Sequence, residues 1–458
     1  MVFPLVGAGE VKEQYEISNS LRFDDGSSAY LNRTQTAGNR RTFTWSAWIK
    51  RGVIGTRQTL WSAGNDGNDE SFLRFDASDY ISYKESTGNS PEFLFDTNQV
   101  FRDPSAWYHI VFAVDTTQSS QDNRIKLYVN GSQVTSYQNT NYPSQNYDTR
   151  WNNNSQVTYL GMNVPDYRDY YDGYMTEVNF IDGLQLAPTD LGEFDDNGVW
   201  VPKRYTGSYG TNGYFLEFQQ TGTSQNSSGI GADTSGNDNH FAVSGIAATD
   251  VTEDTCTNNF ATLTPLLTDT TRTTFSEGNC KNVNTNASTA GTTIAVDKGK
   301  WYCEMICTAK TAVNAVIGIC TVDGFDGERQ IDESQNGGSG HGYVMNATKL
   351  TGGASYGATW AVDDIMGMAL DLDSTQNTIT FYKNGASQGA INIDNALYVF
   401  ANSNGQGSDT TITYSNNFGN PPHSISSGNT DENGYGNFEY APPSGYYALC
   451  TKNLAEFG

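Results

Sequence analysis

Apolar and polar side chains alternate along much of the chain with a period of two residues. The alternation is clear in Thr42–Lys50 and in Ile125–Val129, where every second side chain is apolar. Trp107–Val114 is apolar at both sets of positions, as in a strand that is covered on both faces. A period of two predicts β-strands, and an Asn-Gly pair directly after such a run, at Asn130-Gly131, predicts a hairpin. No long helical repeat competes with this pattern, so the sequence predicts an all-β protein.

One hairpin pattern occurs twice. Ala113–Asp115 leads to Ile125–Gly131, and Ala369–Asp371 leads to Ile379–Gly385. Each pair combines an apolar strand that ends in Asp with an aromatic strand that ends in Tyr-x-Asn-Gly. The two copies lie too far apart for a short-period solenoid, so they predict two domains of related architecture.

Composition changes along the chain and gives the expected domain limits. Residues 221–238 are rich in Gly, Ser, Thr and Asn and offer little apolar surface to bury. We expect an N-terminal arm at 1–17, a first sandwich at 18–220, a connector at 221–274, a second sandwich at 275–422 and a C-terminal segment at 423–458.

The predicted strands resemble two known families. The first half is similar to laminin-G-like domains at Thr42–Lys50 (TFTWSAWIK), Trp107–Asp115 (WYHIVFAVD), Ile125–Gly131 (IKLYVNG) and Tyr171–Gly183 (YDGYMTEVNFIDG). The second half is similar to SPRY domains at Gly299–Ile306 (GKWYCEMI), Val316–Ile319 (VIGI), Asp364–Gly385 (DIMGMALDLDSTQNTITFYKNG) and Asn417–Pro421 (NFGNP). The resemblance implies two concanavalin A-like jelly-roll β-sandwich domains in tandem.

A narrower resemblance concerns the regions outside these motifs. Tyr15–Arg33, Gly231–Phe241, Asn258–Leu266 and Tyr440–Leu454 are similar to virion structural proteins of marine tailed bacteriophages. The resemblance implies a place on the particle surface, contacts with other virion proteins, and a homo-oligomer such as the trimer of a fibre. No coiled-coil heptad accompanies it.

Charge excludes two classes of partner. The chain has 26 Lys+Arg and 51 Asp+Glu, a net charge of −25. Binding to nucleic acid or to anionic lipid requires clustered basic residues, so neither is an expected partner. No apolar stretch approaches the ~20 residues of a membrane span, and we expect no membrane insertion.

Candidate catalytic residues are absent from the sequence pattern. A retaining glycosidase needs two closely spaced carboxylates, and no acidic triplet of the required spacing occurs on one strand face. The spacing of the four His and six Cys supports no zinc site, and His109, inside an aromatic strand, is expected to be packed. The expectation is therefore a non-enzyme, with a glycan depolymerase as the less favoured alternative.

One loop has the composition of a calcium site. Residues 65–70 (NDGNDE) place several hard oxygen ligands close together, and the laminin-G-like resemblance also implies a calcium site in the first domain. A solvated hairpin loop is the simpler interpretation, and no cofactor is otherwise expected.

Aromatic residues give the candidate ligand site. Residues 137–174 are rich in Tyr among amide and carboxylate side chains. Flat rings stack on sugars and also serve protein interfaces. The ligand-binding candidates are Trp151, Tyr167, Tyr170, Tyr171 and Tyr174; contact with a neighbouring virion subunit and packing inside the domain remain alternatives.

The apolar N-terminus is a candidate anchor. Residues 1–9 are too apolar to remain free in water and too short to form a domain, although a frayed terminus is the default alternative. The candidate anchoring residues are Val2, Phe3, Leu5 and Val6. Together these features predict a tail fibre or receptor-binding protein that attaches to a host glycan or protein, or alternatively a capsid decoration or head-fibre protein.

Overall fold

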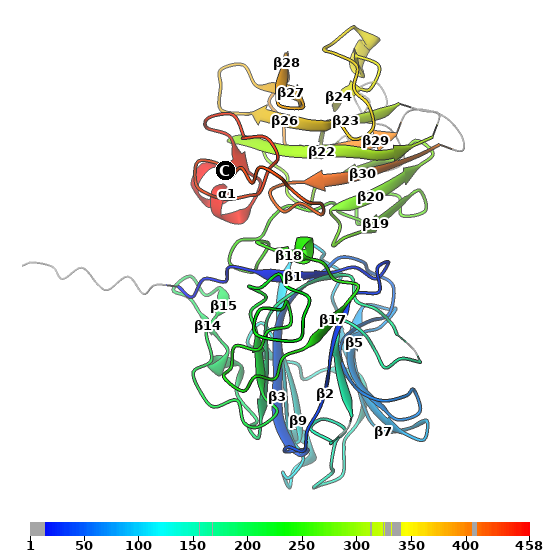
Figure 1. The fold of residues 1–458 in the computed structure, drawn as a ribbon, viewed down its shortest axis with the longest axis vertical. Helices are drawn as coiled ribbons and strands as arrows, with labels where there is room; N and C mark the ends of the chain where they lie inside the picture. Colours follow the sequence, from blue (N-terminus) through cyan, green and yellow to red (C-terminus); the bar gives the residue numbers. More distant parts are fainter. Residues whose placement is uncertain are drawn as a thin grey trace, which may run out of the picture.

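The computed structural model describes residues 14–458 except 155, 167, 312–313, 324, 326–330, 332–339 and 405–409. Tyr167 and the candidate anchoring residues Val2, Phe3, Leu5 and Val6 lie outside the described residues. The described chain forms two β-rich bodies stacked along the long axis of the molecule (Figure 1). Their strands confirm the all-β class and the tandem arrangement of two sandwiches.

The first sandwich consists of two eight-stranded antiparallel sheets. Sheet I has the order β10 (Ser132–Gln133), β9 (Ile125–Val129), β8 (Trp107–Asp115), β3 (Thr42–Arg51), β13 (Gly173–Asp182), β1 (Ser20–Phe23) and β18 (Val251–Thr252), with β16 (Tyr214–Leu216) also on β13. Sheet II has the order β11 (Tyr137–Asn141), β7 (Ser90–Val100), β6 (Tyr80–Thr87), β5 (Glu70–Phe75), β4 (Gln58–Gly64), β12 (Val157–Leu160), β2 (Tyr30–Thr34) and β17 (Ala242–Ser244). A separate ribbon joins β14 (Gly192–Phe194) and β15 (Trp200–Pro202).

The period-two pattern positions the first core. The expected strand at residues 42–50 is β3, and its alternate apolar side chains are fully buried between the two sheets. Indole rings fill the centre: Trp61 stacks on Trp151 with ring centroids 3.3 Å apart and on Trp45 at 5.5 Å. Burying rings of this size accounts for much of the hydrophobic stabilisation of the domain.

The second sandwich also has two sheets. Sheet III has the order β19 (Thr273–Ser276), β20 (Lys281–Thr285), β30 (Thr411–Asn417), β22 (Lys300–Lys310), β26 (Ile365–Asp371), β27 (Thr378–Lys383) and β28 (Ala386–Asn392), and β31 (Tyr447–Ala448) runs parallel to β22. Sheet IV has the order β21 (Thr289–Gly291), β29 (Tyr398–Asn404), β23 (Ala315–Thr321), β24 (Gly340–Val344) and β25 (Thr348–Lys349).

Helix is scarce in the described residues. The α-helix α1 (Thr451–Phe457) lies near the chain's C-terminus, and the 3-10 turns are η1 (Gln121–Asn123), η2 (Pro188–Asp190), η3 (Ala248–Asp250) and η4 (Thr351–Gly353). No helix among the described residues has the length and apolarity to cross a membrane.

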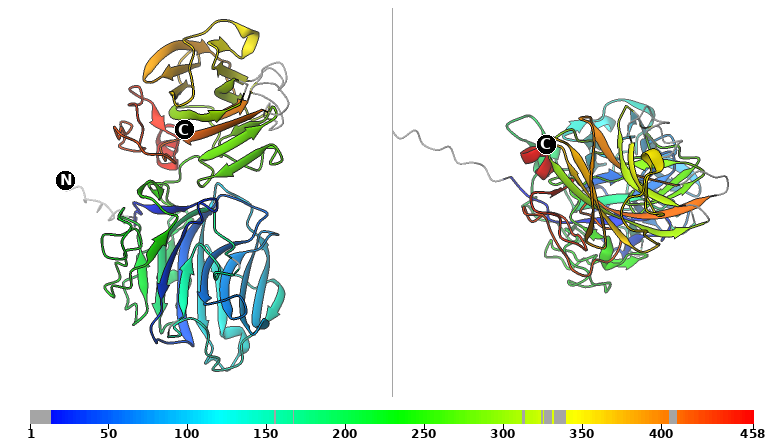
Figure 2. Two further views of the ribbon diagram at one scale, coloured as in Figure 1. Left: turned by 45° about the vertical axis from the view of Figure 1, so that its right-hand side comes forward. Right: turned by 90° about the horizontal axis from the view of Figure 1, so that it is seen from above.

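Residues 221–274 are more than a linker in this structure. They add β17 to the edge of sheet II and β18 to the edge of sheet I, and they bury Ile230 and Phe241 in the first core. Beyond β18 the segment runs through the waist between the sandwiches (Figure 2). Phe260 in this segment packs with Tyr302 and Phe438 of the second body. The two sandwiches therefore meet through a packed segment of chain.

Candidate functional site

Three of the predicted ligand residues are interior packing residues. Trp151, Tyr171 and Tyr174 are each 0% exposed. Trp151 donates from Nε1 to the Tyr83 hydroxyl at 3.2 Å, and the Tyr171 hydroxyl donates to the Lys50 carbonyl at 2.7 Å. A ligand at the surface cannot reach these rings, so the expected aromatic site does not form from them.

Tyr174 is buried by the second sandwich, a cause that its neighbouring residues in the sequence do not reveal. It lies on β13, and its hydroxyl donates to the carbonyl of Gly278, at the start of the second sandwich, at 3.0 Å. The second body therefore covers a side chain that an isolated first domain would expose.

One predicted residue, Tyr170, keeps part of its ring exposed. It stacks on Tyr30, with ring centroids 6.3 Å apart and an interplanar angle of 27°, and Tyr30 contacts Tyr159 at 6.1 Å. These three residues form the tyrosine patch. Tyr159 on β12 and Tyr30 on β2 lie on the outer face of sheet II, and Tyr170 lies in the connection before β13. Tyr159 is 6% exposed, so the accessible ring surface belongs to Tyr30 and Tyr170. Sequence reasoning missed Tyr30, although its alternation with the buried Leu31 places it on an outer face.

Polar groups border the tyrosine patch. Asn32 is the cross-strand partner of Tyr159. Asp169, next to Tyr170 in the chain, pairs with Arg74 at 3.1 Å, and the Arg74 guanidinium lies 4.1 Å from the ring centroid of Phe72. A partly exposed aromatic surface beside amide and charged groups can stack on the flat face of a ring and hydrogen-bond its polar substituents.

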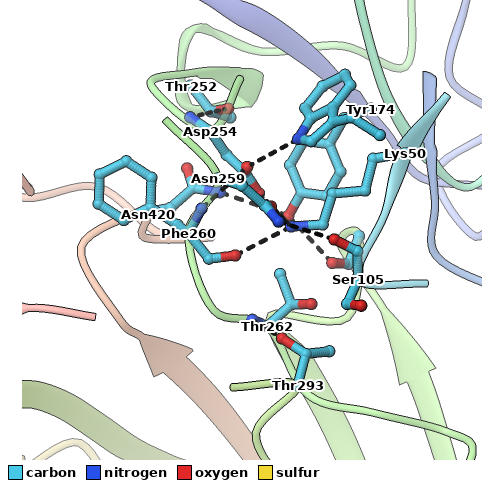
Figure 3. A network of polar contacts seen from close by, with 12 residues as sticks. Lys50, Ser105, Tyr174, Thr252, Asp254, Asn259, Phe260, Thr262, Thr293 and Asn420 are labelled. Atoms are coloured by element: carbon cyan, nitrogen blue, oxygen red, sulfur yellow. Dashed lines mark hydrogen bonds and ion pairs between the residues drawn. The ribbon is translucent and has the colours of Figure 1, made fainter. Parts of the chain in front are cut away.

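A buried ion pair lies in the waist between the sandwiches (Figure 3). The Nζ of Lys50 in β3 is 2.8 Å from Oδ2 of Asp254, and it also donates to Asn259 Oδ1 at 2.7 Å and to the Phe260 carbonyl at 3.0 Å. The side chains of Lys50 and Asp254 are 1% and 0% exposed. All three donors of the ammonium group are therefore satisfied away from water.

A second buried cation joins the bodies directly. Arg22 in β1 lies 3.3 Å from Glu277 and 3.5 Å from Asp250. It also donates to the Thr249 carbonyl at 2.8 Å and to the Pro421 carbonyl at 3.2 Å. Thr249 and Asp250 lie directly before β18, and Glu277 and Pro421 belong to the second sandwich, so Arg22 ties three parts of the chain together.

Two cavities open at this junction. One, of about 400 Å³, is bordered by Asn19, Glu253, Asn420 and His423, and the other, of about 590 Å³, by Asp25, Gly52, Leu266, Phe275 and Asn279. Both volumes fall within the usual range of ligand pockets, about 300–1,000 Å³.

His109 and His423 each contact a serine hydroxyl. His109 is buried as expected, its Nδ1 accepts from Trp200 Nε1 at 2.9 Å, and its Nε2 therefore carries the proton that faces Ser46 Oγ at 2.7 Å. Burial lowers its pKa to about 3. His423 contacts Ser415 Oγ at 2.7 Å, and burial together with Arg22 lowers its pKa to about 4. Among the described contacts no carboxylate orients either ring, as a catalytic triad requires.

Glu177 is the strongest candidate for an acid catalyst. Burial raises its pKa to about 8, and it shares a cavity with Glu217, whose carboxylate pairs with Arg204 at 2.7 Å. Tyr15 borders the same cavity and donates to Glu177 at 3.0 Å. The cavity measures about 150 Å³, which is well below the usual size of a ligand pocket.

The loop at residues 65–70 does not fit a calcium ion. Asp66 Oδ1 accepts the backbone N–H groups of Asn68 and Asp69. Asp69 pairs with Arg150 at 2.8 Å, and Glu70 accepts from Asn163 at 2.9 Å. None of these three carboxylates is both buried and without a hydrogen-bond partner, so the loop shows no unmet charge that a cation would balance.

The first sandwich is similar to domains of the concanavalin A-like class. Residues 24–187 match the sequence model of the concanavalin A-like lectin/glucanases superfamily, which confirms the laminin-G-like resemblance for the first sandwich.

Solved structures similar to the chain have low sequence identity. A SAP-like pentraxin from Limulus polyphemus is 13% identical and aligns with 38% of this chain and 80% of its own, with a TM-score of 0.29. A putative carbohydrate binding protein from Bacteroides ovatus is 15% identical over 50% of this chain and 58% of its own, with a TM-score of 0.34. The SPRY domain of human HERC1 is 12% identical over 32% of this chain and 95% of its own, with a TM-score of 0.26.

Proposed function

We propose that the chain is a non-enzymatic attachment protein that binds a glycan through the tyrosine patch. The observation that carries the proposal is the Tyr30–Tyr170 stack, which keeps exposed ring surface beside Asn32 and the Arg74–Asp169 pair. The patch also lies within the residues that match a superfamily named for lectins and glucanases. Glu177 and Glu217, the best candidates for a catalytic pair, face a cavity of only about 150 Å³, which supports a non-enzymatic role.

We further propose that the protein acts on the surface of a bacteriophage virion, as a tail fibre or receptor-binding appendage. The similarity of residues 15–33, 231–241, 258–266 and 440–454 to phage virion proteins supports this location. A shallow aromatic patch gives a weak contact, which repeated copies in a homo-oligomer multiply into firm attachment. The proposed partners are other virion proteins and a host surface glycan.

Cell-binding measurements test the glycan proposal. Labelled full-length protein is titrated onto host cells, and Tyr30→Ala and Tyr170→Ala are compared with Tyr382→Ala, which removes a half-buried ring from the second sandwich. Loss of one stacking ring should weaken binding about 5- to 30-fold, whereas Tyr382→Ala should leave it unchanged. Equal binding by all the variants would rule out the tyrosine patch.

An assembly role is the second candidate, and one observation favours it. Phe194 and Val199, at the β14–β15 ribbon, are 58% and 56% exposed. Large apolar side chains exposed together are typical of protein contacts. If the chain decorates a capsid, Phe194→Ser with Val199→Ser should abolish incorporation into particles while host-cell binding stays absent throughout.

A depolymerase is the third candidate. Release of reducing sugar from host polysaccharide by purified protein, lost in Glu177→Gln, would replace the attachment proposal with an enzymatic one. We expect no release from either protein.

A further inference from the structure

Three carboxylates meet where the first sandwich contacts the second. Asp24 and Asp25 directly follow β1, and Asp172 directly precedes β13. The pairing of Phe23 with Gly173 brings these strand ends together. One carboxylate oxygen from each of the three lies within 4.8 Å of the others. A point at the centre of three oxygens no farther apart than this lies within about 2.8 Å of each, so small side-chain movements bring all three to the Ca–O distance of about 2.3–2.6 Å. Asp24 also accepts the backbone N–H groups of Ser27 at 2.8 Å and of Glu277 at 3.3 Å, which hold its carboxylate in this place.

Asp172 has no partner of its own in this cluster. It is 0% exposed, and neither of its carboxylate oxygens has a hydrogen-bond partner among the described residues. Burying an ionised carboxylate without a partner costs several kcal/mol. The nearby guanidinium of Arg22 is already engaged by Glu277 and Asp250, so the carboxylate of Asp172 lacks a compensating charge.

The carboxylate of Asp172 occupies the space that a side chain at position 52 would fill. A Cβ built on Gly52 would lie 1.9 Å from Asp172 Oδ1. The Gly52 N–H donates to the Asp172 carbonyl at 3.0 Å, which holds the two backbones together. The absence of a side chain at Gly52 therefore allows the carboxylate to occupy this position beside Asp24 and Asp25.

The second sandwich contributes a polar group to the same place. Asn279 donates to the Gly52 carbonyl at 3.0 Å, and its buried Oδ1 has no hydrogen-bond partner among the described residues. Asn279, Gly52 and Asp25 border the cavity of about 590 Å³, and Asp25 is exposed. An ion can therefore enter from solvent.

We propose that Asp24, Asp25 and Asp172 bind a divalent cation, Ca²⁺ in preference to Mg²⁺, at the junction of the two sandwiches. All the donors are hard oxygens, which these ions prefer. Ca²⁺ accepts irregular coordination by six to eight oxygens, whereas Mg²⁺ requires a near-ideal octahedron at about 2.1 Å. Asn279 of the second body borders the same cavity with its Oδ1 buried and unpartnered, so the ion would lie where the two sandwiches meet.

Calorimetric titration of chelator-treated full-length protein with CaCl₂ tests the proposal. Wild-type protein should bind one Ca²⁺ with a Kd of about 10⁻⁴ M or tighter, as in extracellular calcium modules, and MgCl₂ should bind more weakly. Asp172→Asn should abolish the binding heat. Gly52→Ala, which keeps every ligand but displaces one, should weaken binding about 10- to 100-fold. Asp69→Asn, in the loop at residues 65–70, is the matched control and should bind as the wild type does.

Thermal unfolding gives a second readout that a misfolded variant cannot mimic. In excess Ca²⁺ the wild-type Tm should rise by about 5 °C. Asp172→Asn should have the higher Tm without Ca²⁺, because it removes a buried unpaired charge, and the lower Tm with Ca²⁺. The order of the two proteins should therefore reverse.

Two results would overturn the proposal. If neither Ca²⁺ nor Mg²⁺ at 100 times the expected Kd changes the Tm or gives heat, Asp172 is a protonated buried acid. If Ca²⁺ binds equally well to Asp172→Asn and Gly52→Ala, the ion lies elsewhere. Neither result depends on glycan binding, which is measured on cells.

Discussion

A buried charged residue stabilises the junction only while its oppositely charged partner is present. Replacing Lys50 by Ala leaves Asp254 buried without its cation, and we expect a loss of about 3–5 kcal/mol in the free energy of unfolding. Urea denaturation measures this. Arg41→Ala removes one member of an ion pair whose side chains are 42% and 49% exposed, and should lower the free energy of unfolding much less. Equal losses of stability in Lys50→Ala and Arg41→Ala would mean that burial does not increase the energetic contribution of the Lys50–Asp254 pair.

Buried carboxylates make stability depend on pH. Burial raises the pKa of Glu85 to about 7 and that of Glu177 to about 8. Between the unfolded value near 4.3 and these values, the folded chain binds more protons than the unfolded chain, so stability falls as pH rises. Thermal unfolding from pH 5 to 8.5 should show a loss of several kcal/mol, since each pKa unit corresponds to about 1.4 kcal/mol.

Amide substitution provides the control for this pH effect. The double variant Glu85→Gln with Glu177→Gln should show a flatter profile and exceed the wild type in Tm at pH 8. The exposed Glu92, changed to Gln, should leave the slope intact. A wild-type Tm that stays constant across this range would contradict the prediction.

Residue type was a poor guide to exposure at the aromatic positions. Amphipathic rings suit a surface, an interface and a core alike, and the tyrosines and tryptophan of residues 137–174 serve mostly as packing. Which ring stays exposed depends on sheet pairing and on coverage by the other body, as Tyr170 and Tyr174 show. Neither factor can be predicted from local sequence.

The two Asn-Gly hairpins are the elements that sequence defined best. Asn130 and Gly131 have φ of 46° and 77°, and Asn384 and Gly385 have φ of 47° and 78°. Positive φ at both central residues is the geometry of the tight turn that Asn-Gly predicts. The repeated pattern of the sequence is thus a repeated turn in both sandwiches.

Alanine substitutions at three glycines with positive φ distinguish the cost of backbone strain from the cost of crowding by a neighbouring ring. A Cβ on Gly131 would lie 2.5 Å from the Trp200 ring, and one on Gly385 would lie 2.6 Å from Tyr440, whereas Gly198, with φ of 79°, faces open space. We expect Gly198→Ala to cost about 1 kcal/mol and the other two about 2–4 kcal/mol in chemical denaturation. Three equal losses would show that the neighbouring rings give way.

Strands could be predicted, but their distant pairing could not. The alternation gave β3, β8 and β9 nearly residue for residue. It contains no information that β1 pairs with β13, because a period of two fits any partner strand. The acidic cluster depends on that pairing, which explains why the acid-rich loop at residues 65–70 was the more visible candidate in the sequence.

At the scale of the whole molecule, the junction should make the two sandwiches unfold together. Arg22 contacts groups from three parts of the chain and is 1% exposed. We expect one calorimetric transition for the full chain. Arg22→Met should split it into two, because it leaves Glu277 and Asp250 without their common cation.

Arg51 provides the matched control for this experiment. It is equally buried but pairs with Asp79 inside the first sandwich. Arg51→Met should lower the transition temperature without splitting the peak. Two transitions in the wild type would mean that the junction does not couple the bodies.

Residues 221–274 are ordered despite their linker-like composition, for a physical reason. A segment rich in Gly, Ser, Thr and Asn needs only a few apolar anchors to become ordered once strands on either side accept its backbone hydrogen bonds. Ile230, Phe241 and Phe260 are those anchors here. Averages over residues 221–274 hide them, because they are few and widely spaced.

The packed waist has a mechanical consequence. When a flexible linker joins two domains, the linker extends under load before force reaches either domain, and its thermal motion makes the distance between the domains variable. Here a pull on one sandwich passes at once to β1 and β3 through the Arg22 and Lys50 contacts. The molecule should behave as a stiff rod under shear, with the tyrosine patch held at a fixed distance from the second sandwich.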